Sequence, residues 1–271
     1  MSAIDLDAYF ARVGYDGSRA PTLDTLRALH RFHPAAIAFE NLDPLLKRPV
    51  RLDIGALMDK LVHAGRGGYC YEHNILFQAA LRAIGFTVAS LAARVQWNVP
   101  PGTDTPRYHM LLRIDLPDGP YIADVGFGRL TLTAPLRLAA GIEQQTPHGL
   151  YRLVAIGSEF QMQTRLEGTW SPIYQLSLQE QTHSDWEAAN WYTSTHPESR
   201  FTRGLMAARC DEHCRYGLFN MDLRVYREGS TERRRLKSAP ELVAVLRDTF
   251  RMKLPEGCDA LFERLAGSSA E

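Results

Sequence analysis

The chain has 271 residues, 45% of them apolar, which is enough for one large domain or two to three small ones with a sizeable core. Lys and Arg number 31 and Asp and Glu also number 31, so no global charge attracts nucleic acid or an anionic membrane. No apolar run approaches the roughly 18 residues of a membrane span, and the amino terminus lacks the pattern of a secretory signal. We therefore expect a soluble, cytoplasmic protein with no nucleic-acid or membrane partner, whose oligomeric state the sequence leaves open.

The first 85 residues have the apolar spacing of helices. Leucines repeat over residues 23–34, and a further short helical piece is predicted over 39–42. The spacing over residues 53–65 predicts an amphipathic helix, with Asp53 as its N-cap and Gly65 as its stop. A last helix is predicted to begin at Cys70 and to end at Gly85.

From residue 86 the apolar period becomes that of strands, which predicts a β-meander or a barrel. The strand-like segments are residues 86–97, 107–115, 121–128, 151–157 and 159–165. The turn at 116–120, Leu-Pro-Asp-Gly-Pro, predicts a hairpin between the second and third of them. A helical connection is expected around 184–208. Short strands and an amphipathic helix over 239–252 follow it, and the basic run at 233–237 is interpreted as a solvated strand edge.

The stretch Arg-Gly-Gly-Tyr-Cys-Tyr-Glu-His-Asn, residues 66–74, is the most informative part of the sequence. Two glycines permit unusual backbone angles and close approaches, and Cys70 then stands where the next helix begins. Unpaired N–H groups and the positive end of the helix dipole favour thiolate over thiol there. The N–H of Tyr71 or a neighbour could also stabilise an oxyanion. Cys70 is therefore a candidate nucleophile, although a lone cysteine among apolar residues is more often a packed thiol.

A cysteine nucleophile needs a base, and the base needs a partner that orients it. His109 lies in the apolar strand Tyr-His-Met-Leu-Leu-Arg-Ile, and Asp124 lies among apolar residues in Tyr-Ile-Ala-Asp-Val-Gly-Phe-Gly. An imidazole or a carboxylate buried without a partner is costly, so each side chain is expected to contact the other. An Asp124 that accepts from one ring nitrogen leaves the second nitrogen free to take the proton of Cys70.

The strand register poses a difficulty for this pair. A tight turn at Asp118 and Gly119 would set His109 opposite Gly128, roughly 13 Å along the strand from Asp124. Direct pairing of His109 with Asp124 requires a longer loop or a bulge near residues 115–119.

The other histidines, among them His30, His33, His63, His148 and His183, are interpreted mostly as surface or packing residues. His73 lies three residues beyond Cys70 on the same helix face and is a weaker candidate for the base. Cys210 and Cys214 flank His213 but lack the second ligand pair of a zinc site, so they are interpreted as surface or half-buried thiols.

Six stretches in the same order resemble the arylamine N-acetyltransferases over nearly the whole chain. They are Arg-Gly-Gly-Tyr-Cys-Tyr-Glu-His-Asn, Ala-Ile-Ala-Phe-Glu-Asn-Leu-Asp-Pro-Leu-Leu, Leu-Ala-Ala-Arg-Val-Gln-Trp-Asn-Val-Pro, Arg-Tyr-His-Met-Leu-Leu-Arg-Ile-Asp, Ile-Ala-Asp-Val-Gly-Phe-Gly and Asn-Trp-Tyr-Thr-Ser-Thr-His-Pro-Glu-Ser-Arg-Phe. The resemblance implies an α+β fold with an amino-terminal helical bundle, a central β-barrel, a carboxy-terminal α/β lid and a papain- or transglutaminase-like Cys-His-Asp core. We expect domains at residues 1–85 and 86–190, a helical connection at 191–208 and the lid at 209–271.

The resemblance also implies a ping-pong reaction with acetyl-CoA as co-substrate and no metal. Cys70, His109 and Asp124 match the catalytic triad, and the acceptor would be an arylamine, an arylhydrazine or an N-hydroxyarylamine. By the same resemblance four side chains line the aromatic slot and three residues adjoin CoA. The slot residues are Phe39, Tyr71, Val95 and Phe127, and the CoA residues are Gly126, Gly128 and Phe201. Core packing is the competing explanation for each aromatic residue.

Two other functions remain open at this point. A peptidase or transglutaminase could use the same three residues on protein substrates, and it would need an open groove. A protein that only binds CoA or another small molecule could carry the three residues without being acylated at Cys70.

Overall fold

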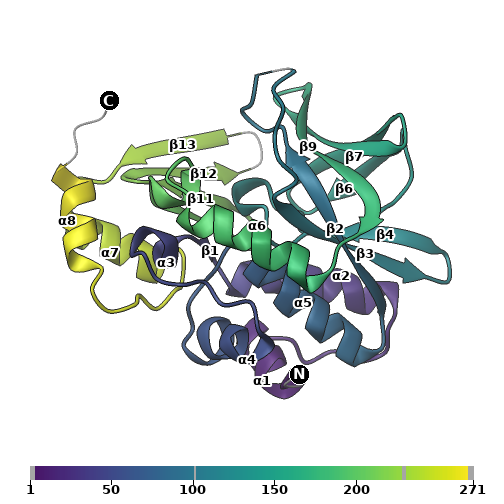
Figure 1. The fold of residues 1–271 in the computed structure, drawn as a ribbon, viewed down its shortest axis with the longest axis horizontal. Helices are drawn as coiled ribbons and strands as arrows, with labels where there is room; N and C mark the ends of the chain where they lie inside the picture. The colour runs from purple at the N-terminus through teal and green to yellow at the C-terminus, as the bar shows by residue number, and fades with distance from the viewer. Residues whose placement is uncertain (1–3, 101, 228–229, 268–271) are drawn as a thin grey trace.

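The computed structural model describes residues 4–100, 102–227 and 230–267. An eight-stranded sheet and a five-stranded sheet lie side by side, and helices from the first third of the chain pack below them (Figure 1). Helix α6, His183–Thr195, crosses the front of the molecule between the two sheets (Figure 1).

The amino-terminal third is helical, as the sequence predicted. Its elements are α1 (Leu6–Val13), α2 (Leu23–Ala36), α3 (Leu42–Leu45), α4 (Ile54–Leu57), η1 (Met58–His63) and α5 (Cys70–Ile84). The side chain of Asp53 accepts from the N–H of Ala56, which confirms it as the N-cap, and Gly85 ends α5 in the left-handed conformation. Helix α2 continues through Pro34 to Ala36, because a proline in the last turn removes only one helical hydrogen bond.

The helical piece predicted around Phe39 is wrong at that residue. Phe39 and Glu40 form strand β1 (Phe39–Glu40), which pairs antiparallel with β10 (Met206–Cys210), and only the following α3 is helical. The partner strand lies more than 160 positions further along the chain, so no local pattern could indicate the pairing.

The central sheet has the order β5-β4-β3-β2-β9-β8-β7-β6. Its strands are β2 (Thr87–Val95), β3 (His109–Leu116), β4 (Gly119–Ala123), β5 (Leu136–Arg137), β6 (Glu143–Thr146), β7 (Gly149–Ile156), β8 (Glu159–Leu166) and β9 (Thr169–Glu180). The two edges approach each other, since the side chain of Gln144 on β6 makes hydrogen bonds of 2.7 and 3.0 Å with the backbone of Arg137 on β5. The sheet is therefore a nearly closed barrel, as expected.

The second sheet has the order β1-β10-β11-β12-β13, with β11 (Arg215–Phe219), β12 (Asp222–Arg227) and β13 (Ser230–Arg235). Helices α7 (Ala239–Asp248) and α8 (Asp259–Gly267) share a buried core with it. Strand β13 is the exposed edge, which confirms the interpretation of the basic run.

Two expected domain boundaries do not coincide with the ends of elements. The boundary at 190 falls inside α6, and β10 begins at residue 206, before the expected start of the lid at 209. Helix α6 and the short η3 (Arg200–Thr202) form one connection between the sheets, because the barrel already ends at Glu180. The division into three parts itself stays a prediction.

Helix α5 packs on the barrel and so brings its first residue to the barrel edge. Phe77 and Leu81 of α5 share one buried cluster with Met110 and Leu112 of β3. The later turns of α5 are consequently held by apolar packing against β3. In the described part of the chain, no helix is long and apolar enough to cross a membrane.

Candidate active site

Cys70 is the first residue of α5, as the sequence predicted. The chain reaches it through Gly67, where an added Cβ would lie 2.1 Å from the carbonyl oxygen of Ala38. Tyr69 is the N-cap residue, and its N–H donates to the carboxylate of Glu72 at 3.0 Å. The first N–H groups of a helix have no partner within the helix, so the Cys70 sulfur lies at its positive end.

His109 and Asp124 form a buried pair beside Cys70. Nε2 of His109 lies 2.7 Å from Oδ2 of Asp124, and the two side chains are 5% and 0% exposed. Burial by itself lowers the pKa of His109, but the charge and hydrogen bond of Asp124 and a hydrogen bond with Cys70 raise it to about 10. Burial raises the pKa of the Asp124 carboxyl, yet His109 and the surrounding donors hold it below its usual value. The pair is therefore built to keep an imidazolium next to the sulfur.

The strand register, which the sequence left open, is neither of the two considered, although the predicted contact between His109 and Asp124 forms. Leu116 pairs with Gly119 across a two-residue turn, and the last pair of the β3–β4 ladder is Leu112 with Ala123. In this register the position opposite Asp124 is Leu111, so His109 is the diagonal neighbour of Asp124 on the same face. Because the chain leaves the ladder at Asp124, the side chain reaches His109 without a bulge or a longer loop.

Asn74 is a site residue to which the sequence analysis gave no role beside Cys70. Its Nδ2 donates to Oδ1 of Asp124 at 3.2 Å and to the carbonyl of Met110 at 2.8 Å, and its Oδ1 accepts from the N–H of Val125. Asn74 therefore ties α5 to both barrel strands. Its position four residues after Cys70, on the same helix face, was the available signal.

Gly126 allows the Asp124 loop to approach the start of α5. A Cβ there would lie 2.9 Å from the Cα of Cys70 and 2.9 Å from Nδ2 of Asn74. The N–H of Gly126 donates to Oδ1 of Asp124 at 3.0 Å. This amide, which we expected to face CoA, is thus engaged within the site, and close packing accounts for the glycine.

Of the residues expected to contact substrates, three aromatic side chains lie near the triad. The ring centroid of Phe127 is 4.9 Å from that of His109, and Phe39 packs 6.3 Å from Phe201. A Cβ on Gly128 would lie 3.5 Å from the ring of Phe39. Phe39, Phe127 and Phe201 are all half-buried, so they keep some exposed surface beside the site.

The remaining two expected slot residues lie differently. Tyr71 is fully buried against Tyr69 and Trp186, and its hydroxyl donates to the carbonyl of Tyr108, so packing accounts for it. Val95 is half-buried at the end of β2, opposite Tyr174, whose ring lies 5.1 Å from that of His109.

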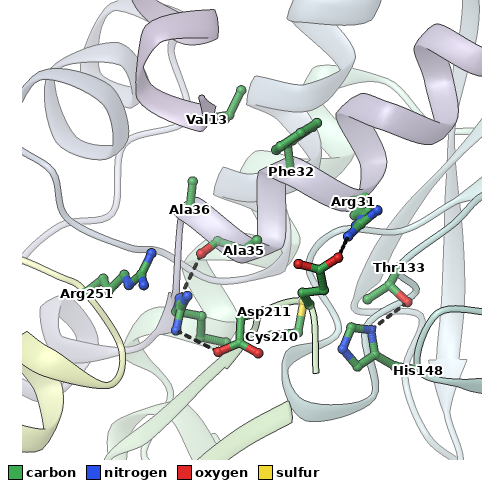
Figure 2. Close-up of a pocket in the computed structure, with 12 residues that line it drawn as sticks. Val13, Arg31, Phe32, Ala35, Ala36, Thr133, His148, Cys210, Asp211 and Arg251 are labelled. Carbon is green, nitrogen blue, oxygen red and sulfur yellow. Dashed lines mark hydrogen bonds and ion pairs between the residues drawn. The ribbon is translucent and has the colours of Figure 1, made fainter. Parts of the chain in front are cut away.

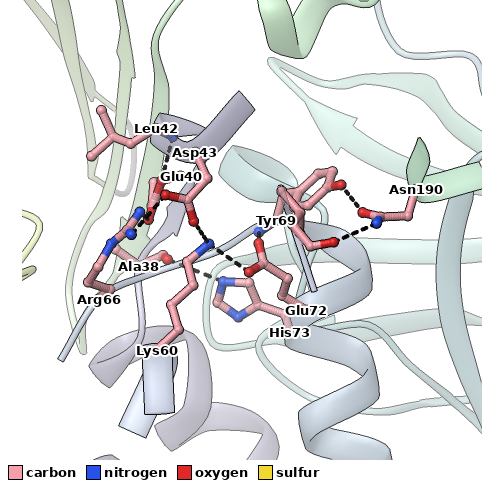
Figure 3. Close-up of polar contacts among 11 residues, drawn as sticks. Ala38, Glu40, Leu42, Asp43, Lys60, Arg66, Tyr69, Glu72, His73 and Asn190 are labelled. Atoms are coloured by element: carbon pink, nitrogen blue, oxygen red, sulfur yellow. Dashed lines mark hydrogen bonds and ion pairs between the residues drawn. The ribbon is translucent and has the colours of Figure 1, made fainter. Parts of the chain in front are cut away.

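A buried ion cluster holds the segment before Cys70, and sequence analysis did not predict it (Figure 3). Lys60 contacts the carboxylates of Asp43 and Glu72 at 2.6 Å each, and Arg66 contacts those of Glu40 and Asp43 at 3.0 and 2.8 Å. Three carboxylates thus share two cations. Burial, only partly opposed by Lys60, raises the pKa of Glu72 to about 7.

His30 and His33, interpreted as surface or packing residues, and His73, the weaker candidate for the base, all form buried hydrogen bonds. His33 bonds to the hydroxyl of Tyr9 and to His73, each at 2.9 Å, and Nε2 of His73 lies 3.2 Å from the carbonyl of Ala38. Both nitrogens of His73 are therefore engaged away from Cys70, which makes it unsuitable as the base. His30 accepts from the N–H of Asp124.

Other chemically notable residues lie apart from the triad. A pocket of about 270 Å³ beside α2 and β10 is lined partly by Arg31, His148, Arg209 and Arg251, and it includes none of the triad (Figure 2). Cys210 also lines this pocket.

Cys210 and Cys214 are both buried, not surface or half-buried as expected. Within the described ranges, no group of three or more His, Cys, Asp or Glu side chains is arranged to hold a metal ion.

Comparison of the sequence with known proteins shows to which family the chain belongs. The sequence profile of a family described as N-acetyltransferase matches residues 22–258. The arylamine N-acetyltransferase of Mycobacterium tuberculosis is 44% identical over 92% of this chain and 89% of that protein. A Salmonella typhimurium protein, named arylamine N-acetyltransferase / N-hydroxyarylamine O-acetyltransferase, is 44% identical over 90% of this chain and 88% of its own length.

The fold agrees with this comparison. The solved structure of Mycobacterium marinum arylamine N-acetyltransferase in complex with CoA matches with a TM-score of 0.93 and 41% identity, over 97% of this chain and 98% of that one. Sequence identity, coverage and backbone geometry thus agree over nearly the whole length. The chain belongs to the arylamine N-acetyltransferase family and is an acyltransferase.

Proposed function

We propose that the enzyme transfers an acetyl group from acetyl-CoA to an aromatic amine by a ping-pong mechanism through a thioester on Cys70. The observation that carries this proposal is the buried His109–Asp124 pair, 2.7 Å apart, with Cys70 beside it at the start of α5. A relative solved in complex with CoA supports CoA as the carrier of the acyl group. We expect the three residues to act as the corresponding groups do in papain-like cysteine enzymes.

In the first half-reaction the Cys70 thiolate attacks the thioester carbonyl of acetyl-CoA. The new S–C bond forms as the C–S bond to CoA breaks, and the His109 imidazolium gives its proton to the departing CoA sulfur. Backbone N–H groups at the start of α5 are placed to stabilise the oxyanion. Asp124 keeps the imidazole in one orientation throughout.

In the second half-reaction the amine nitrogen attacks the acetyl-Cys70 carbonyl. His109, now neutral, takes a proton from the attacking nitrogen as Cys70 leaves as thiolate, and the product is an amide. Arylamines, arylhydrazines and N-hydroxyarylamines suit the aromatic surface offered by Phe39, Phe127 and Phe201. By the family resemblance, CoA would adjoin Gly128, which lies beside Phe39.

The test is intact-protein mass spectrometry after mixing with acetyl-CoA alone. We expect a gain of one acetyl group, located on Cys70 by peptide mapping and removed when aniline is added, with acetanilide as product. Cys70→Ala should abolish the gain, whereas Cys258→Ala, which removes a buried thiol far along the chain, should keep it.

Two outcomes would favour the other functions. Hydrolysis of a peptide by wild-type protein but not by Cys70→Ala would indicate a peptidase. Saturable binding of acetyl-CoA without acylation of any residue would indicate a binding protein, and acylation elsewhere would overturn the assignment of Cys70.

A further inference from the structure

The backbone of Asp124 has an acceptor that lies outside the triad and comes from another part of the chain. The β3–β4 ladder ends at Leu112 and Ala123, so the N–H of Asp124 has no strand carbonyl to meet. It donates instead to Nε2 of His30, on α2, at 3.1 Å. Both residues are 0% exposed, so water cannot take the place of this acceptor.

We propose that His30 is a positioning residue of the triad, which fixes Asp124 so that its carboxylate faces His109. This inference rests on the proposed function of Cys70, His109 and Asp124. Oδ1 of Asp124 is held by Asn74 and Gly126, and Oδ2 by His109. The side chain is thus fixed by its own partners, and His30 fixes the backbone from which it projects.

The hydrogen bond defines the tautomer of His30. Because Nε2 accepts, the ring proton must be on Nδ1, and in the described part of the chain this buried nitrogen has no hydrogen-bond partner. A buried donor without a partner is destabilising, and leucine would fill similar space without it. Packing alone therefore does not account for a histidine at this position.

The surroundings keep His30 neutral. Its ring lies edge-on to Phe77, with centroids 5.8 Å apart, and the ionisable groups that face it are Asp124 from the end of β4 and His33 from its own helix. Burial lowers the pKa of His30 to about 4, against the opposing effect of the Asp124 charge. Nε2 is therefore an acceptor at neutral pH.

The first test uses the unmodified protein. Long-range ¹⁵N–¹H spectra of the imidazoles should show His30 at pH 7 with a proton on Nδ1 and none on Nε2. His73, whose Nε2 faces the carbonyl of Ala38, should show the opposite tautomer and serves as the internal reference. A proton on Nε2 of His30 would overturn the proposal.

The second test measures the alkylation of Cys70 by iodoacetamide as a function of pH. His30→Leu removes the acceptor, and we expect the rate at pH 6 to fall about tenfold or more and the midpoint of the profile to move to higher pH. His30→Gln offers Oε1 in a similar place and should stay within about twofold of wild type. Hydrogen exchange of the Asp124 amide should be faster than in wild type in His30→Leu, which lacks the acceptor, but not in His30→Gln.

The control for general loosening of α2 is Leu26→Ala, which makes a cavity in the same helix without touching Asp124. It should lower the melting temperature and leave the midpoint of alkylation unchanged. A folded His30→Leu variant with the wild-type profile, or a His30→Gln variant as slow as His30→Leu, would contradict the role of the acceptor. If His30→Leu does not fold, the proposal is tested by the two remaining measurements. These are the alkylation rate of His30→Gln and the tautomer of His30 in the wild-type protein.

Failure of the proposed function gives a different result. Wild-type Cys70 would then react no faster than an ordinary thiol, while the tautomer of His30 and the amide exchange of Asp124 would still report on this hydrogen bond.

Discussion

The buried side chains of His109 and Asp124 have partners that compensate for their burial. A carboxylate at 0% exposure is costly by itself, and Asp124 receives hydrogen bonds from His109, Asn74 and the N–H of Gly126. Since these donors hold the pKa of Asp124 low, the negative charge persists and the raised pKa of His109 follows from it. The chemistry proposed for Cys70 thus also depends on Asn74 and on the backbone of Gly126, which act through Asp124.

Removing His109 should remove the thiolate. In His109→Ala we expect alkylation of Cys70 by iodoacetamide near pH 7 to fall by at least about a hundredfold, because the sulfur loses both its base and its counter-ion. His183→Ala, an exposed residue of α6, is the matched control and should react like wild type. Unchanged reactivity in His109→Ala would refute the pairing.

Gly126→Ala should lower the acetyl-transfer rate strongly, because the added methyl group would displace the backbone near Cys70. The added Cβ would lie 2.9 Å from the Cα of Cys70, so either α5 or the Asp124 loop must move, and a displacement of about 1 Å can cost about a hundredfold in rate. Acetanilide formation measures the loss. Gly55→Ala, whose Cβ would meet only the Asp53 side chain at 3.4 Å, should keep full activity.

The start of α5 is held by the ion cluster of Glu40, Asp43, Lys60, Arg66 and Glu72. Glu72 caps the helix by accepting from the N–H of Tyr69, and Lys60 holds Glu72 while it also holds Asp43. Ion pairs therefore connect the end of α5 that carries Cys70 to η1 and α3. The remaining turns of α5 are held by apolar packing.

Lys60→Met should destabilise the fold strongly. The substitution leaves Glu72 and Asp43 buried without this cation, and breaking a buried ion pair on one side costs about 3–5 kcal/mol. Urea unfolding at pH 7 measures the change. Arg27→Met breaks an exposed pair with Asp24 and should cost less than about 1 kcal/mol. Equal losses in the two variants would contradict the structural role of the cluster.

At the scale of the whole molecule, the site joins all parts of the described fold. The helical third supplies Cys70 and the barrel supplies His109 and Asp124, while β1 ties the segment before Cys70 to the second sheet. Three neutral histidines lie among the packed helices, and one of them, His30, also contacts Asp124 after β4. Burial lowers the pKa of His30 and of His73 to about 4, and that of His33 well below its ordinary value.

These histidines make the stability of the whole fold depend on pH. Their folded-state pKa lies below the unfolded value of about 6.5, so the unfolded chain binds more protons between these values and stability falls as the pH falls toward 4. In His73→Gln the loss of unfolding free energy between pH 6.5 and 4.5 should be smaller by about 1 kcal/mol per pH unit. Urea titrations at both pH values measure it.

The control for this prediction is His183→Gln, which changes an exposed histidine of α6 and should keep the wild-type dependence. The same slope in His73→Gln and wild type would show that His73 is not buried in its neutral form.

By itself, the sequence predicted most of the helices and strands, the position of Cys70 at the start of a helix and the contact between His109 and Asp124. These depend on local patterns: helix spacing and a cap before Cys70, and ionisable residues within apolar strands at His109 and Asp124. It did not determine the register of β3 and β4, the pairing of Phe39 with Ala208, or the hydrogen bond from Asp124 to His30. The register depends on which two residues form the hairpin turn, and a shift of one position at the turn changes every pair. The other two contacts join residues far apart in the chain, which become neighbours only in the tertiary structure.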